Sequence, residues 1–148
     1  MLFAAVPVWA HSGWAFAQTA LPETIERIKP SIVAVGSFQR LRTPQFRFSG
    51  TGFIVGDGLK VATNEHVIAK ITGDKGEIAI AIPRPGGKAQ IRSARQLVGD
   101  PESDLALLSI DGPALPPLRL ADGTQVREGE TYFFTGFPIG GVLGLFPV

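Results

Sequence analysis

Two short segments of this 148-residue chain carry side chains that could do acid–base chemistry, and the first is built around His66. This histidine stands three residues after the short run Val-Ala-Thr at 61–63, where a strand is expected to end. Histidine is the side chain best suited to taking and returning a proton near neutral pH, so an activated hydroxyl nucleophile usually needs one. A single histidine is more often an ordinary surface or core residue. His66 therefore needs a partner before it indicates catalysis.

Asp104, in the second segment, is the expected partner. It stands immediately before the apolar stretch 105–110, and a carboxylate buried at the mouth of such a strand is costly unless something pairs with it. A carboxylate bonded to one imidazole nitrogen fixes the tautomer of the ring and stabilises its protonated form. The sequence thus predicts a hydrogen bond between His66 and Asp104, with Ala106 leaving room for the ring. The alternative role, a turn aspartate, suits Asp100 better because Asp100 opens an Asp-Pro turn.

The elements that must position these residues are strands, after one short helix. Pro22 and Glu23 suit a helix start, and Pro30 suits its end. Beyond Pro30 the chain consists of apolar runs of strand length bounded by Gly and Pro, which is typical of an all-β barrel or sandwich. The predicted strands are 31–38, 50–55, 60–63, 77–82, 90–98 and 104–110. Six antiparallel strands can close one small barrel.

A proline-rich break separates this barrel from the C-terminal part of the chain. Residues 112–117 read Gly-Pro-Ala-Leu-Pro-Pro, and clustered prolines cannot continue a strand ladder. Residues 131–135 then have the pattern of a seventh strand, which leaves no partner except a Gly-rich tail. We therefore expect a first barrel over 31–111, a linker over 112–130, and the truncated start of a second barrel over 131–148.

The first 17 residues resemble an export signal. They are apolar and end in Ala-Phe-Ala at 15–17, an A-x-A cleavage pattern, so we expect a signal peptide over 1–17 and an N-terminal segment with the short helix over 18–30. No Lys or Arg precedes Arg27, so the usual positive start is missing, and an apolar arm packed on the domain is the alternative. No later stretch approaches the ~20 apolar residues of a membrane span. The predicted location is exported, either periplasmic or secreted.

Composition argues against several other classes of function. A net charge of +1 gives no field for nucleic acid, and the arginines interleaved with phenylalanine over 39–48 are interpreted as a solvated hairpin tip. Two histidines and no cysteine are too few for a histidine- or cysteine-built metal site. Gly50, Gly52 and Gly56 miss the spacing of a dinucleotide-binding loop. We expect no cofactor, no metal and no nucleic-acid partner.

Order and spacing of the two segments also resemble a known family. Ala-Thr-Asn-Glu-His-Val at 62–67, followed by Asp-Leu-Ala-Leu-Leu at 104–108, is similar to the trypsin-like serine proteases. Within that family it most resembles the bacterial periplasmic heat-shock proteases of the Do or high-temperature-requirement type. The stretches 23–33 and 49–53 support the same resemblance, and 136–140 resembles the start of that family's second barrel, with Phe137 in place of Asn. The resemblance covers residues 23 to about 141.

The resemblance implies a chymotrypsin-like fold of two six-stranded antiparallel barrels, with His and Asp on the first and Ser on the second. It implies that His66 is the general base, that Asp104 orients it, and that the substrate is a polypeptide. The chain departs from the family at the nucleophile, because none of its serines has a G-x-S-G-G context. Those serines are Ser12, Ser31, Ser37, Ser49, Ser93, Ser103 and Ser109.

The predicted function is therefore serine-type endopeptidase, with this chain as a fragment that is inactive alone. A non-catalytic, peptide-binding pseudo-protease barrel is the alternative from a different class. A third possibility is an incomplete or frame-shifted gene product, and the apolar ending over 141–148 favours truncation. Peptide-bond preference and oligomeric state are not encoded in these motifs.

Overall fold

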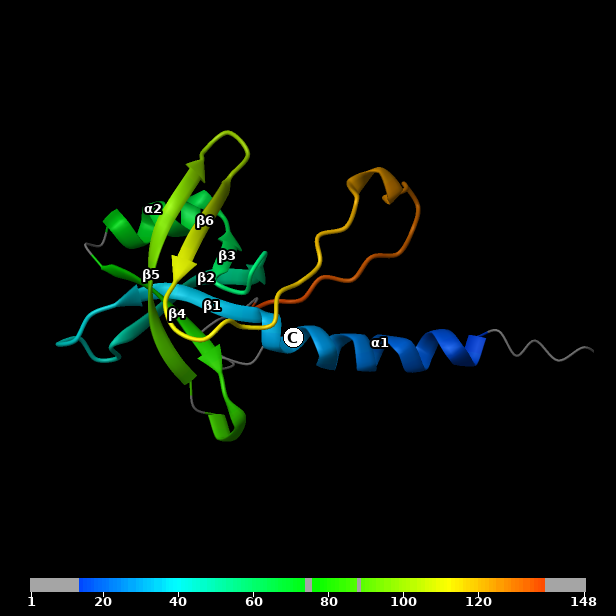
Figure 1. The fold of residues 1–148 in the computed structure, drawn as a ribbon, viewed down its shortest axis with the longest axis horizontal. Coiled ribbons are helices and arrows are strands. Elements are labelled where there is room, and N and C mark those ends of the chain that lie inside the picture. Colours follow the sequence, from blue (N-terminus) through cyan, green and yellow to red (C-terminus); the bar gives the residue numbers. More distant parts are fainter. Residues whose placement is uncertain (1–13, 74–75, 88, 138–148) are drawn as a thin grey trace, which may run out of the picture.

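The six apolar runs form six strands. A computed structural model describes residues 14–73, 76–87 and 89–137, and its strands pair antiparallel in the closed order β1-β2-β3-β6-β5-β4 (Figure 1). The prediction of an all-β, six-stranded antiparallel barrel is thereby confirmed. The strands are β1 Ile32–Phe38, β2 Phe46–Val55, β3 Lys60–Thr63, β4 Glu77–Pro83, β5 Ala89–Asp100 and β6 Leu105–Ile110.

Strand β1 shows how the sequence builds the core. Successive side chains of a strand point to opposite faces. Val33 and Val35 accordingly lie in the main core cluster inside the barrel, whereas Ile32 and Ala34 belong to a second apolar cluster. All four are fully buried, because β1 is covered on both faces. The next residue, Gly36, sits where the pairing with β2 shifts register, and a Cβ there would collide with the main chain of Arg47.

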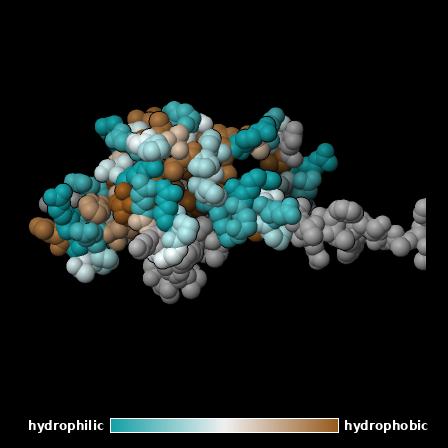
Figure 2. Space-filling view, turned by 60° about the horizontal axis from the view of Figure 1, so that its bottom comes forward, coloured by the Kyte–Doolittle hydropathy of each residue, from teal (hydrophilic) through white to brown (hydrophobic). Residues whose placement is uncertain are grey.

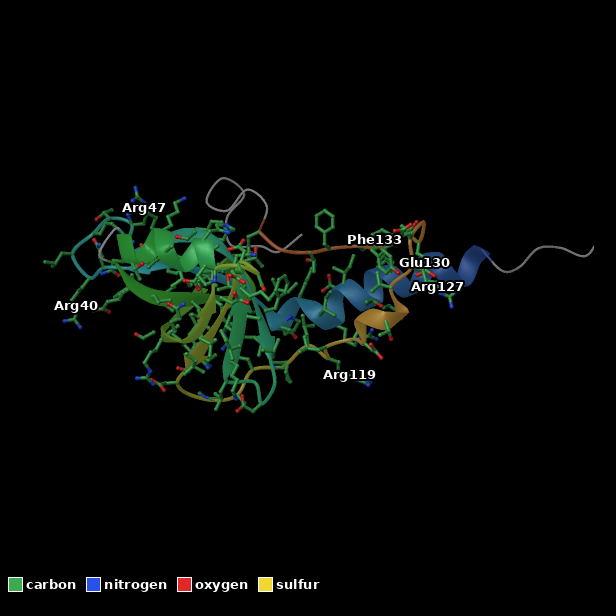
Figure 3. All side chains as sticks on the ribbon, turned by 90° about the horizontal axis from the view of Figure 1, so that it is seen from above. Arg40, Arg47, Arg119, Arg127, Glu130 and Phe133 are labelled. Atoms are coloured by element: carbon green, nitrogen blue, oxygen red, sulfur yellow. The ribbon has the colours of Figure 1, made fainter. Side chains whose placement is uncertain are left out.

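The hairpin tip between β1 and β2 is held by one arginine. The Arg42 guanidinium donates to the carbonyl of Ser37 at 2.7 Å, to the Ser37 hydroxyl at 3.0 Å, and to the carbonyls of Pro44 and Gln45, both at 3.1 Å. Arg40 and Arg47 lie on either side of this tip, at the end of the barrel (Figure 3). The tip is mostly exposed, as a solvated hairpin requires.

Helix α1 Trp14–Ile28 is longer than the short helix expected near residues 21–30. Pro30 lies in the following 3-10 turn, Lys29–Ser31, so the α-helix ends close to the predicted stop. Residues 1–13 of the predicted signal peptide lie outside the described residues, and residues 14–17 belong to α1. Signal cleavage stays a prediction. Among the described residues, no helix has the length and apolar character needed to cross a membrane.

A second helix, α2 Glu65–Gly73, was not predicted. The sequence predicted no element between the strands 60–63 and 77–82, so this helix was missed. Asparagine before the first helical residue and an acidic residue in the first turn favour a helix start. The helix is stable here because one face is buried in the barrel core, through Val67, Ile68 and Ile71.

After β6 the chain leaves the barrel and comes back. Residues 111–118 still run along the barrel, with Leu115 in the main core cluster and the Leu118 N–H donating to the carbonyl of Ile54 at 2.8 Å. Residues 119–137, here called the arm, then loop away from the barrel and contain one 3-10 turn, Gly123–Gln125 (Figure 1). Arg119 lies where this loop leaves the barrel, and Arg127, Glu130 and Phe133 lie farther out along it, away from the barrel strands (Figure 3).

The seventh strand expected over 131–135 is not present, and this prediction is corrected. These residues have no strand pairing, because no other described strand has a free edge beside them and a single strand is not stable without a partner. Their apolar side chains are exposed instead, with Phe134 at 99%. Elsewhere too, apolar surface interrupts the polar surface of the molecule (Figure 2).

The returning end of the arm docks on the barrel through Phe137. This side chain is 4% exposed and packs edge to face on Phe48, with ring centroids 6.0 Å apart. Its main-chain N–H donates to Thr51 Oγ1 at 2.9 Å. Of the predicted tail 136–140, residues 138–140 lie outside the described residues.

Candidate active site

Strand pairing brings the two predicted site residues together. Strands β3 and β6 are antiparallel neighbours, with Thr63 opposite Ala106. The end of β3 and the start of β6 therefore meet at the same end of the barrel. His66 lies in the first turn of α2, three residues after β3 ends, and Asp104 immediately precedes β6.

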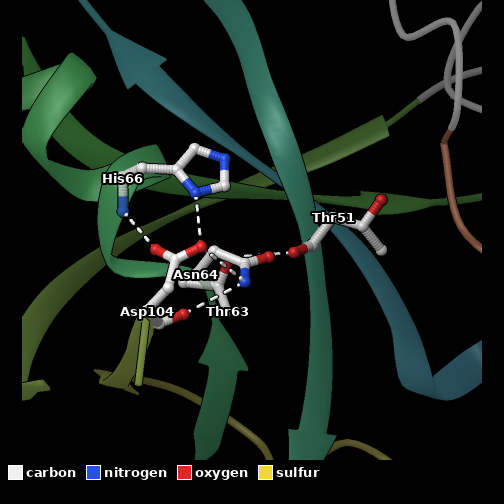
Figure 4. Close-up of polar contacts among 5 residues, drawn as sticks. All are labelled: Thr51, Thr63, Asn64, His66 and Asp104. Carbon is white, nitrogen blue, oxygen red and sulfur yellow. Dashed lines mark hydrogen bonds and ion pairs between the residues drawn. The ribbon is translucent and has the colours of Figure 1, made fainter. Parts of the chain in front are cut away.

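The two residues make two hydrogen bonds. His66 Nδ1 lies 2.7 Å from Asp104 Oδ2, and the main-chain N–H of His66 donates to Asp104 Oδ1 at 2.9 Å (Figure 4). The predicted side-chain hydrogen bond is thus present. Because the second bond uses the main chain, the carboxylate is fixed relative to α2 as well as to the ring.

The charge on Asp104 is set by these contacts. The main-chain N–H of His66 and then the His66 ring hold the pKa of Asp104 below its usual range. Desolvation opposes them with a smaller effect, and the Asn64 amide lowers the pKa most weakly. An ionised carboxylate can only accept hydrogen bonds, so Nδ1 of the neutral ring must carry the proton. Nε2 is then left with its lone pair, ready to accept a proton from a neighbouring group.

The site is more open than the sequence suggested. The side chains of His66 and Asp104 are 69% and 45% exposed, so the expectation of a buried carboxylate was wrong. Asp104 precedes the strand, whereas the inward-facing positions of β6 begin at Ala106, which belongs to the core cluster rather than to a space around the ring. Water has access to both groups in the described part of the chain.

Asp100 behaves as the turn residue that the sequence indicated. Its Oδ1 accepts the main-chain N–H groups of Glu102 and Ser103, at 3.1 and 3.3 Å, and hydrogen bonds from Ser103 and Glu102 lower its pKa. Its carboxylate is thus committed to its own turn, whereas that of Asp104 binds His66. The structure therefore gives different roles to two carboxylates that are close together in the sequence.

Sequence reasoning missed three polar residues that support the pair. Asn64 donates to Asp104, and buried Thr63 donates through Oγ1 to the carbonyl of Thr51 at 2.8 Å (Figure 4). Glu65 accepts a hydrogen bond from Gln96 of β5 at 2.9 Å, which ties the first turn of α2 to the barrel wall. The three residues immediately precede His66 in sequence, and that adjacency was the available signal.

A metal centre has no support in the described residues. No group of three or more His, Asp or Glu side chains lies close enough together there to hold an ion. The expectation that the protein uses no metal or cofactor remains a prediction.

Comparisons with known proteins agree with this geometry. The family described as "Trypsin-like peptidase domain" matches residues 50–145, which include both His66 and Asp104. A protein named probable periplasmic serine endoprotease DegP-like, from Pseudomonas putida, is 37% identical over 92 residues, covering 62% of this chain and 17% of its own length. Serine protease HTRA1A from Danio rerio is 28% identical over 123 residues, covering 80% of this chain and 24% of its own.

A solved structure shares the fold. The crystal structure of Deg5 matches with a TM-score of 0.57 and 24% sequence identity, covering 75% of this chain and 52% of that one. By comparison, the match to the Pseudomonas putida relatives covers 17% of their length, so this chain spans only about a sixth of those proteins.

Proposed function

This chain belongs to the trypsin-like peptidase domain family, and from that premise we propose that it is the His- and Asp-bearing part of a serine endopeptidase. The observation that carries the proposal is the hydrogen bond between His66 Nδ1 and Asp104 Oδ2. It leaves Nε2 as the one ring nitrogen able to accept a proton. The substrate class is polypeptide.

The proposed chemistry is acyl transfer in two halves. A serine hydroxyl attacks the carbonyl carbon of a peptide bond while His66 Nε2 takes its proton. The protonated ring, stabilised by the Asp104 carboxylate, then gives that proton to the departing amine as the C–N bond breaks. Water repeats the sequence on the acyl-enzyme, releasing the acid and restoring the serine.

The nucleophile must come from a segment that this sequence does not contain, since none of its serines stands in G-x-S-G-G. We expect the 148-residue chain to be inactive by itself. Removing the nucleophile from such a triad lowers turnover on the order of 10⁶-fold. The oxyanion-hole donors of the family belong with the same segment, so even residual catalysis should be absent.

The test compares this chain with one extended through any downstream in-frame G-x-S-G-G. The extended chain should hydrolyse casein and react with a fluorophosphonate probe, and His66→Ala and Asp104→Asn should each suppress both signals. The short chain should give neither. Labelling of the short chain that His66→Ala abolishes would show that it holds its own nucleophile and would overturn the assignment.

The alternative is a barrel that binds peptides without cleaving them. The lack of a nucleophilic serine in these 148 residues favours it. An extended chain that binds an unfolded polypeptide but is never labelled by the probe would establish this second function.

We also propose that the protein is exported to the periplasm or beyond. The Ala-Phe-Ala pattern at 15–17 supports export, and the Pseudomonas relatives are named periplasmic. Mass spectrometry of protein recovered from the producing cells should find a mature chain starting at Gln18. Recovery of the intact form alone, from the cytosol, would contradict export.

A further inference from the structure

Asp104 has an unusual backbone. Its φ is +50°, and among the described residues it is the only one other than glycine with a positive φ. The left-handed region brings a Cβ close to the neighbouring carbonyl, and although aspartate tolerates it better than most residues, the conformation still costs free energy that surrounding contacts must offset. Contacts that stabilise this conformation therefore help to hold the carboxylate toward His66.

The contacts that hold it come from Asn64. Its Nδ2 donates to the main-chain carbonyl of Asp104 at 3.0 Å and to Oδ2 of the same residue at 3.2 Å (Figure 4). One amide group thus restrains both the backbone and the side chain of Asp104. Asn64 is itself restrained, because it joins β3 to α2 and its carbonyl accepts the N–H of Val67 at 3.2 Å.

We propose that Asn64 is a positioning residue for the His66–Asp104 pair, holding Asp104 in the left-handed conformation from which its carboxylate reaches His66. The relevance of this role to hydrolysis rests on the proposed function. The lowered pKa of Asp104 agrees with it, since the Asn64 amide is one of the groups that stabilise the ionised form.

Helix capping does not explain these contacts. A residue in the position of Asn64 caps a helix by accepting N–H groups with its side-chain oxygen, whereas the contacts to Asp104 are donated by Nδ2. The N–H of His66, in the first turn of α2, is instead satisfied by Asp104 Oδ1. The Asp104 carboxylate therefore caps the N-terminus of α2, and the Asn64 amide positions that carboxylate.

The experiment follows Asp104 by carbon-13 NMR of its carboxyl group and His66 by nitrogen-15 NMR of its ring, in wild type, Asn64→Ala and Asn64→Ser. Serine keeps the preference for a helix start but its side chain is one bond shorter and cannot reach both acceptors. Both variants should raise the pKa of Asp104 toward that of an ordinary aspartate and weaken the Nδ1 hydrogen bond. If the pKa of Asp104 and the Nδ1 hydrogen bond of His66 keep their wild-type values in Asn64→Ser, or in both variants, the proposal is overturned.

A matched control uses a second aspartate with a lowered pKa. Lys60 Nζ donates to Asp57 Oδ2 at 2.6 Å and lowers the pKa of Asp57. Lys60→Gln should raise the pKa of Asp57 and leave Asp104 and His66 unchanged. A change at Asp104 in this control would mean that the readout is not local, and would count against the role of Asn64.

Unfolding midpoints in urea test the backbone part of the role separately. Asn64→Ser should lower the midpoint of the wild-type protein but not that of Asp104→Gly, because glycine adopts a positive φ without support. An equal lowering in both backgrounds would contradict the proposal. None of these readouts requires substrate, so failure of the proposed function would appear as absent hydrolysis by the extended chain while these results stood.

Discussion

The barrel and the arm both contain large apolar residues, and these reach opposite structural outcomes. In the barrel, every strand has two hydrogen-bonded neighbours, and the apolar side chains of β1 and the inward-facing ones of β6 are covered. In the arm, apolar residues as large as Phe134 remain in contact with solvent. Apolar sequence alone therefore does not make a strand; a partner with a free edge is also required.

The same contrast applies to the site. His66 and Asp104 are brought together because their segments flank two paired strands of the barrel. Asn64, which supports Asp104, directly follows barrel strand β3. The arm instead returns to the barrel at Thr51, where Phe137 docks. We infer that the His–Asp pair is a property of the barrel, to which the arm is an attached segment.

The largest expected effect is on the barrel core. Ile54→Ala removes a fully buried side chain and should lower the free energy of unfolding by about 2–5 kcal/mol. The matched arm variant Leu120→Ala removes an exposed side chain and should change it by less than about 0.5 kcal/mol. Urea denaturation measures both values. Equal changes in the free energy of unfolding for the two variants would contradict the difference in packing between barrel and arm.

Phe137→Ala should have the next largest effect, since this side chain is buried among Ile32, Ala34 and Ala81. The expected cost is about 2–3 kcal/mol, below the usual cost of truncating a core phenylalanine, because the arm end can move away without opening the barrel. Phe134→Ala is the matched control, with no measurable cost. If Phe137→Ala is also neutral by urea denaturation, the arm end does not dock in solution.

Thr51→Val should cost about 1 kcal/mol, because it removes the hydroxyl that accepts the Phe137 N–H while keeping the shape of the side chain. Thr51→Ser retains the hydroxyl and should restore most of that loss. Hydrogen exchange of the Phe137 amide gives the local readout, and it should become faster in the valine variant alone. Unchanged exchange in Thr51→Val would mean that this contact does not hold the arm.

Acid should weaken the protein in part through Asp104. Its pKa is lower in the folded state than in the unfolded chain, so its contribution to stability is complete above the unfolded value and is lost as pH falls through the folded value. Asp104→Asn should therefore flatten the pH dependence of unfolding below about pH 4, where a free aspartate titrates. A wild-type pH profile in this variant would show that the hydrogen bonds of Asp104 do not depend on its charge.

The sequence predicted the structure correctly where a local pattern is compatible with only one kind of element. Each of the six apolar runs between residues 31 and 110 formed a strand, and the order of His66 and Asp104 correctly indicated a hydrogen-bonded pair. Helix α2 was missed because a nine-residue helix is too short to be stable by itself and depends on burying Ile68 and Ile71 in a barrel that local sequence does not show.

Two other features could not be predicted for a similar reason. The exposure of Asp104 depends on which segments cover the end of the barrel, and its left-handed backbone depends on an amide forty residues earlier in the chain, at Asn64. The expected strand over 131–135 failed because strand formation needs a neighbour, and pattern alone supplies none.

The most direct test of the central claim is nitrogen-15 NMR of the His66 ring in the 148-residue chain, at a pH where the ring is neutral. If the barrel alone forms the pair, the proton should lie on Nδ1, hydrogen-bonded to Asp104, and Nε2 should be bare. Asp104→Asn should abolish that preference. A ring that already favours the proton on Nε2 in the wild-type chain, as a free histidine does, would contradict the account.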